Sequence, residues 1–138
     1  MTLMMPSLVR RHLKQSERFV RSEERDALPP GISIPPGEAL VGWYRNPSPW
    51  DGDIVVFTDC ALYSKGEGEG LRIAWDEIVD YETPKSKVDV TGVLIRTPGG
   101  VAFVRMAGAH GPEGKFKDVF GLVMLLNTLV NLRRNSLS

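Results

Sequence analysis

Between residues 39 and 107, apolar residues recur at every second position in short runs, and turn-forming residues end each run. This period of two is typical of β-strands that bury one face. Because the connections are short, the runs predict an antiparallel meander. The predicted strands cover, in chain order, residues 39–45, 53–58, 61–65, 71–75, 78–84, 90–97 and 101–107.

Turn chemistry indicates how these strands connect. Asp59 and Cys60 join the second and third strands into a hairpin, and Pro98-Gly99-Gly100 is a strong hairpin signal between the last two. Asp76 and Glu77 are expected to form a corner. One side chain in every two should then face the interior. The predicted inward residues are Val55, Phe57, Leu62, Ile73, Ile78, Leu94 and Phe103.

The period changes to that of a helix over residues 115–134. One apolar face of this helix comprises Phe116, Val119, Phe120, Val123, Leu126 and Val130, with Leu122 and Leu129 at its margin. Leu125 and Leu132 lie nearly opposite that face, so they are expected to need a second partner. Either an N-terminal helix or a second subunit could cover them. Trp50, in a loop of turn formers, is a further candidate interface residue.

Residues 7–27 are rich in helix formers and predict a helix that Pro29-Pro30-Gly31 stops. Residues 28–38 contain four prolines and predict an extended linker. We therefore expect two parts, an N-terminal helix with its linker (residues 1–36) and a β-rich domain with the C-terminal helix (residues 37–138).

Five segments together resemble the bacterial pleckstrin-homology-like (PH-like) and GRAM-type pattern. They are GEALVGWYR, DIVVFTDCALYSK, RIAWDEIVDYE, VLIRTPGGVAFVRM and FKDVFGLVMLL. The resemblance spans roughly residues 37–132. It implies a mainly β (α+β) fold, a barrel of about seven antiparallel strands closed by the C-terminal helix, here with an extra N-terminal helix. Phe116, Phe120 and Val123 would cover one barrel opening. The resemblance also implies a non-catalytic binding module.

Many members of that family bind phosphoinositides through basic residues in the loop after the first strand. The corresponding residues 46–53 contain no Lys or Arg, and they include Asp51 and Asp53. Like charge would repel an anionic headgroup there, so no specific phosphoinositide binding is expected at this loop.

Residues 108–115, GAHGPEGK, differ from a phosphate-binding loop in glycine spacing and lack the hydroxyl residue after the lysine. Lys115, Lys117 and Arg105 are candidate residues for weak anion binding at the start of the C-terminal helix. Two distant histidines and one cysteine predict no catalytic residues, metal site or cofactor. A pI near 6.7 and sparse aromatics near the basic residues argue against nucleic-acid binding.

Residues 51–82 carry nine acidic and two basic side chains, whereas residues 83–138 carry eight basic and three acidic ones. These complementary blocks favour association. The sequence therefore predicts a non-catalytic module for protein–protein association, including a homodimer. The alternative is peripheral lipid or small-anion binding through the basic late strands. With no secretory signal or apolar membrane span in the sequence, the expected location is cytoplasmic.

Overall fold

The computed structural model describes residues 5–13, 19–21, 32–46, 53–65, 70–82, 92–106 and 117–137. In the last of these segments, side chains are described at residues 119 and 121–132. The elements are, in order, α1 (Met5–Leu13), β1 (Phe19–Arg21), β2 (Leu40–Arg45), β3 (Ile54–Thr58), β4 (Ala61–Lys65), β5 (Leu71–Ala74), the short 3-10 helix η3 (Trp75–Glu77), β6 (Asp80–Glu82), β7 (Gly92–Thr97), β8 (Gly100–Arg105) and α2 (Lys117–Leu137).

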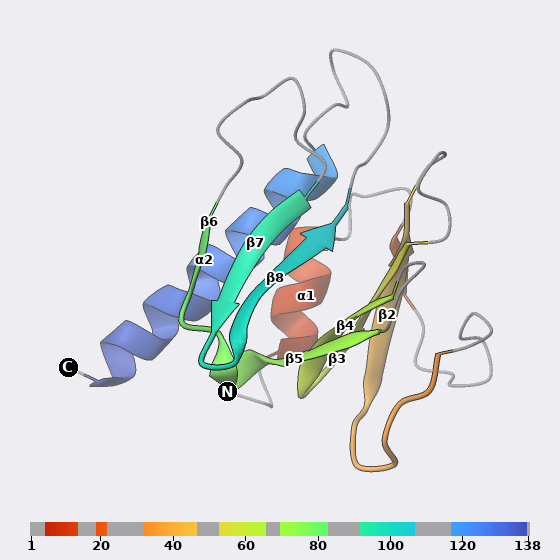
Figure 1. Cartoon of the computed structure of the whole chain (residues 1–138), viewed down its shortest axis with the longest axis horizontal. Coiled ribbons are helices and arrows are strands. Elements are labelled where there is room, and N and C mark those ends of the chain that lie inside the picture. Colours follow the sequence, from red (N-terminus) through yellow and green to blue (C-terminus); the bar gives the residue numbers. More distant parts are fainter. Residues whose placement is uncertain are drawn as a thin grey trace.

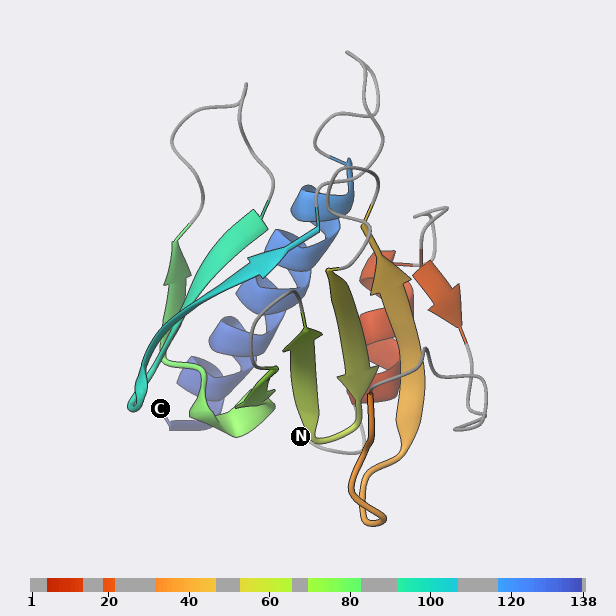
Figure 2. The same cartoon turned by 45° about the vertical axis from the view of Figure 1, so that its right-hand side comes forward.

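These strands form two antiparallel sheets, so the fold is mainly β with two helices, as predicted. The first sheet has five strands in the order β1-β2-β3-β4-β5, and the second has three in the order β6-β7-β8. Figure 2 shows α1 behind the five-stranded sheet, and Figures 1 and 2 show α2 along the three-stranded sheet. The described ladders make two sheets, and a closed barrel is not shown.

The alternating pattern predicts the meander well. Strands β2 to β8 fall within or next to the seven predicted runs, and β3 and β4 form the predicted hairpin with Phe57 opposite Leu62. Asp76 and Glu77 lie in the 3-10 helix, which makes the expected corner. The predicted turn at Pro98 and Gly99 joins β7 to β8.

The N-terminal prediction is wrong in its extent. The helix ends at Leu13, and Phe19–Arg21 is a strand that pairs antiparallel with β2, placing Phe19 opposite Tyr44. Pairing with β2 satisfies backbone groups of this short segment and explains why it is not helical. Residues 14–18 and 22–31 lie outside the described residues.

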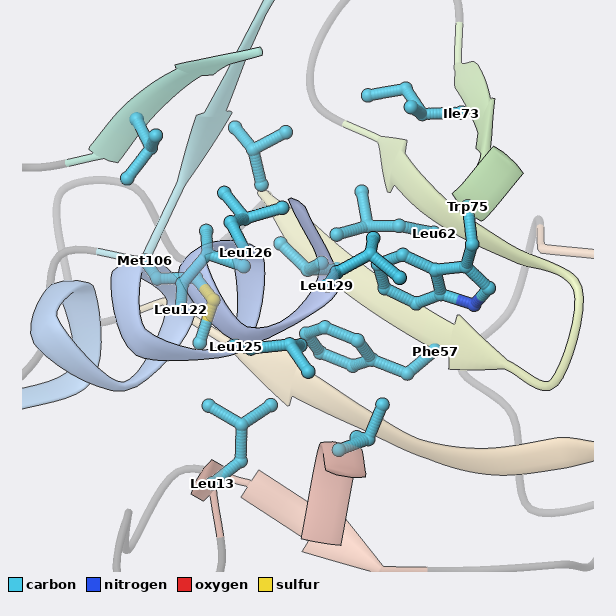
Figure 3. Close-up of a cluster of buried hydrophobic side chains, with 14 of the residues drawn as sticks. Leu13, Phe57, Leu62, Ile73, Trp75, Met106, Leu122, Leu125, Leu126 and Leu129 are labelled. Atoms are coloured by element: carbon cyan, nitrogen blue, oxygen red, sulfur yellow. The ribbon is translucent and has the colours of Figure 1, made fainter. Parts of the chain in front are cut away.

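One large core joins the helices to both sheets. It includes Met5, Leu8, Val9 and Leu13 of α1, together with inward side chains of the strands and of α2. Figure 3 shows Leu13, Phe57 and Leu125 directed into this cluster. The close packing of the helices depends on Gly121, because a Cβ there would come within 2.8 Å of the His12 carbonyl oxygen. Residues of α1 therefore belong to the same core as the sheets.

The predicted inward residues are buried in the five-stranded sheet, but those of the three-stranded sheet are exposed. Val55, Phe57, Leu62, Ile73 and Ile78 are buried as predicted. The prediction for Leu94 and Phe103 is wrong, because these side chains are 37% and 41% exposed and Val93, Ile95 and Val104 are buried in their place. A shift of one residue turns every side chain of a strand to the opposite face. Of the three residues expected to cover a barrel opening, Val123 packs against the core, while Phe116 and the side chain of Phe120 lie outside the described residues.

Candidate functional site

The outer face of the five-stranded sheet is covered by the end of the proline-rich linker. Ile32 and Ile34 pack against a second, smaller apolar cluster formed by Leu40, Trp43 and Val56. The linker then turns, with the Glu38 amide donating to the Pro35 carbonyl at 3.1 Å, and enters β2. We call this outer surface the covered face.

The carboxylate of Glu38 anchors the linker to this face. It is only 6% exposed, and it accepts hydrogen bonds from Thr58 Oγ1 and from the Tyr63 hydroxyl, each at 2.7 Å. Arg72 adds an ion pair, with 3.1 Å between Nη2 and Glu38 Oε2. These three partners come from β3, β4 and β5, so one side chain ties the linker to three neighbouring strands. A buried carboxylate needs such partners, because an unpaired buried charge is strongly destabilising.

The charge states follow from these contacts. Burial raises the pKa of Glu38, but the hydrogen bonds from Tyr63, Thr58 and Arg72 outweigh burial and hold the pKa below its ordinary value. Burial and the hydrogen bond to Glu38 raise the pKa of the Tyr63 hydroxyl. At neutral pH the carboxylate is therefore ionised and the phenol protonated. A carboxylate held by three donors in this way contributes to stability as a structural anchor.

Backbone contacts continue the anchor into the β3–β4 hairpin. The Ala39 amide donates to Asp59 Oδ1 at 2.8 Å, and the Asp59 amide donates to the Ala39 carbonyl at 3.0 Å. Thr58 Oγ1 also accepts from the amide of Ala61 at 2.9 Å, closing the turn. Nothing in the local sequence reveals this cluster, since the partners of Glu38 lie 20, 25 and 34 residues further along the chain.

Two pockets flank Arg72. One, of about 310 Å³, is lined by apolar residues that include Ile54 and Val56 and by the basic residues Lys65 and Arg72. The other, of about 380 Å³, lies beside Asp59, Cys60 and η3. Burial, followed by the hydrogen bond with Asp59, raises the pKa of the Cys60 thiol and keeps it protonated at neutral pH. Protonation makes this thiol a poor nucleophile.

The residues predicted to bind an anion are not shown together. Lys115 lies outside the described residues, and of Lys117 only the backbone is described, as the first residue of α2. Arg105 forms an ion pair with Asp53, with 2.6 Å between Nη1 and Oδ2. The Arg105 carbonyl also accepts a hydrogen bond from Asn46 Nδ2 at 2.9 Å. Arg105 thus ties the end of β8 to the end of β2 and to Asp53, and its charge is directed at an internal partner.

The three residues predicted to form an interface, Trp50, Leu125 and Leu132, have different outcomes. Trp50 lies outside the described residues. Leu125 is completely buried in the main core, so the proposal that it contacts a second subunit is wrong. The N-terminal helix, the other partner considered for it, packs against α2. Leu132 is partly buried against the same core.

The outer face of the three-stranded sheet is different, and we call it the open face. Leu94, Val101 and Phe103 lie there, and Val101 is 62% exposed. Leu94 and Phe103 are cross-strand neighbours, as are Arg96 and Val101. The Phe103 ring lies over Gly92, where a Cβ would come within 2.7 Å of it.

Charged side chains border the open face and neutralise one another. Arg96 forms ion pairs with Asp80 at 2.9 Å and with Glu82 at 3.0 Å. The guanidinium carbon of Arg105 lies 5.3 Å from the centre of the Phe103 ring. The open face thus presents an apolar centre within a rim of paired charges, which is the pattern of many protein interfaces.

Within the described part of the chain, no group of three His, Cys, Asp or Glu side chains is placed to hold a metal ion. None of the helices described there is long and apolar enough to cross a membrane. Comparisons with protein-family models, with curated proteins and with solved structures find no match to this chain.

Proposed function

We propose that this protein is a non-catalytic interaction module that binds a protein partner, a second copy of itself included, through the open face of the β6-β7-β8 sheet. The observation that carries the proposal is the exposure of Leu94, Val101 and Phe103 side by side on one face. Clustered apolar side chains on a surface favour association, because burying them removes apolar area from water.

The alternative, anion or lipid binding through the late basic strands, has weaker support. Arg96 pairs with Asp80 and Glu82, and Arg105 pairs with Asp53. An anion would have to displace these carboxylates before it could use either guanidinium. The same pairs join the basic block of the sequence to its acidic block within one chain. Charge complementarity between two copies is therefore not part of the proposed association.

We further propose that the chain is a PH-like domain of the bacterial or GRAM type. Seven strands in two antiparallel sheets, β2 to β8, followed by a C-terminal helix support this, since the family has the same element order. We also propose a cytoplasmic location, where the single cysteine, Cys60, would remain reduced.

The association is tested by sedimentation velocity over a range of concentrations. Wild type should form a dimer or larger species that a Leu94→Lys, Val101→Lys double variant does not form. Leu71→Lys is the matched control, because Leu71 is an apolar side chain 47% exposed on the other sheet. A strictly monomeric wild type, or equal dissociation by the control variant, would refute self-association through the open face.

A different protein partner is tested by a photo-crosslinking residue placed at position 101 or, as control, at position 71. If wild type is monomeric, crosslinks from position 101 and not from position 71 would indicate a heterologous partner at the open face. The absence of crosslinks from both positions would contradict the proposed function.

A further inference from the structure

A third pocket lies between α1 and β1, away from both outer faces. It measures about 330 Å³, and the described residues that line it are Ser7, Arg10, Arg11, Phe19 and Arg21. A volume of this size is at the lower end of the range for small-molecule sites.

The spacing of these residues explains why they meet. Arg10 and Arg11 follow Ser7 by three and four positions on α1, so both lie on the same side of the helix as Ser7. Phe19 and Arg21 are two positions apart in β1 and so share one side of the strand. Pairing of β1 with β2 places that side against the helix, because Arg21 lies opposite Gly42 and Phe19 opposite Tyr44, whose side chain is in the main core.

Among the described residues that line the pocket, the charged ones are all basic. Three of its five described residues are arginines, of which Arg10 already has an interaction of its own, and none of the five is acidic. Arg11 and Arg21 are exposed, and within the described residues neither makes an ion pair. Burial is the larger cause that lowers the pKa of His12, and the charge of the neighbouring Arg11 is the second cause. Guanidinium groups concentrated in this way repel one another and attract an anion.

Two further groups suit an organic phosphate. Ser7 offers a hydroxyl that can donate to a phosphate oxygen. Phe19 is only partly buried, and it packs edge-on against Phe57 with 5.8 Å between ring centres, which holds the ring in place. An aromatic or apolar group of a ligand can contact such a ring.

We propose that this pocket binds the phosphate ester of a small soluble molecule, with Arg11 and Arg21 donating to the phosphate oxygens and Phe19 contacting the organic part. Arg is suited to this role because its planar fork of N–H groups matches two phosphate oxygens at once. The site is separate from the open face, so it does not depend on the proposed protein association.

Phenyl phosphate and inorganic phosphate are the probes, titrated calorimetrically into the full chain. Wild type should bind phenyl phosphate more tightly than inorganic phosphate. Arg21→Gln should weaken phenyl phosphate binding by about tenfold, and the Arg11→Gln, Arg21→Gln double variant should abolish it, because each change removes a charge-assisted hydrogen bond.

Arg45→Gln is the matched control. Arg45 is an exposed arginine on the neighbouring strand β2, and its position has the opposite side-chain direction to the β2 residues that Phe19 and Arg21 oppose. Arg45→Gln removes the same charge as Arg21→Gln. It should change the dissociation constant for phenyl phosphate by less than about twofold, since the interaction of Arg45 with the ligand would be long-range and screened by salt. Circular dichroism confirms that each variant is folded.

Three results would overturn the proposal. The first is no phenyl phosphate binding by wild type at physiological salt, and the second is equal weakening by Arg21→Gln and Arg45→Gln. The third is binding to phosphatidylserine vesicles that depends on Arg11 and Arg21 without any binding of phenyl phosphate. That last result would assign the arginines to a membrane surface and not to a soluble ligand.

Discussion

The outer faces of the two sheets differ in what lies over them. On the five-stranded sheet, Ile32 and Ile34 of the linker pack against apolar side chains, and buried Glu38 anchors the linker. On the three-stranded sheet, Leu94 and Phe103 remain exposed, and the nearby ion pairs of Arg96 are exposed as well. The comparison indicates that the covered face contributes to folding, whereas the apolar side chains of the open face remain accessible to solvent.

Two phenylalanines give the largest expected contrast. Phe57→Ala removes a completely buried ring that stacks on Trp75, with 6.3 Å between ring centres. We expect it to lower the free energy of unfolding by about 4 kcal/mol, because it leaves a cavity in the core. Phe103→Ala on the open face should lower it by about 1 kcal/mol through the lost contact with its neighbours. Urea denaturation of both variants measures the difference, and equal losses would show that the open face is part of the folding core.

Two glutamates give the next contrast. Glu38→Ala leaves the hydroxyls of Thr58 and Tyr63 without their shared acceptor, and it should destabilise the protein by about 2–3 kcal/mol. Hydrogen exchange at the Ala39 amide, which donates to Asp59 Oδ1, should accelerate because the linker loses its anchor. Glu82→Ala breaks an exposed ion pair with Arg96, and its effect should lie within experimental error. A stable Glu38→Ala variant with unchanged exchange would show that the apolar contacts alone hold the linker.

Acid stability should depend on the same anchor. The pKa of Glu38 is lower in the folded chain than its ordinary value of 4.5, so the folded state binds the proton less readily than the unfolded state. The resulting stabilisation is complete above pH 4.5 and is lost as the pH falls through the folded-state pKa. Glu38→Gln should flatten this part of the curve of stability against pH. Thermal denaturation between neutral and acidic pH measures it, and an unchanged curve would exclude Glu38 as the titrating group.

The smallest effect is expected for Val101→Thr. Val101 is 62% exposed, and threonine keeps the branched shape that strands favour. Stability should change by less than about 0.5 kcal/mol, as is usual for surface positions. A loss above about 1 kcal/mol would mean that part of the chain covers the open face in solution.

The sequence predicts β2 to β8 and α2 because alternation and helical period are repeated many times along these segments. It fails at β1, since three residues are too few to show a period and the strand depends on pairing with β2. It also fails on the phase of β7, where Val93, Leu94 and Ile95 are all apolar and alternation cannot decide which of them is buried. The Glu38 anchor and the arginine pocket combine residues from separate elements, so no local pattern reveals them.

Contact between α1 and α2 has a consequence for how the chain is made. His12 Nε2 lies 3.3 Å from Thr128 Oγ1, although the two residues are 116 positions apart in the sequence. Gly121 allows the His12 backbone to approach α2 closely. During synthesis, the apolar side of α1 leaves the ribosome long before α2 exists to cover it. Contacts between residues so distant in sequence slow folding, because loop-closure entropy is lost before these contacts stabilise the fold. Through most of translation, α2 therefore does not cover Met5, Leu8, Val9 and Leu13 of the nascent chain. A chaperone can bind these apolar side chains during that period.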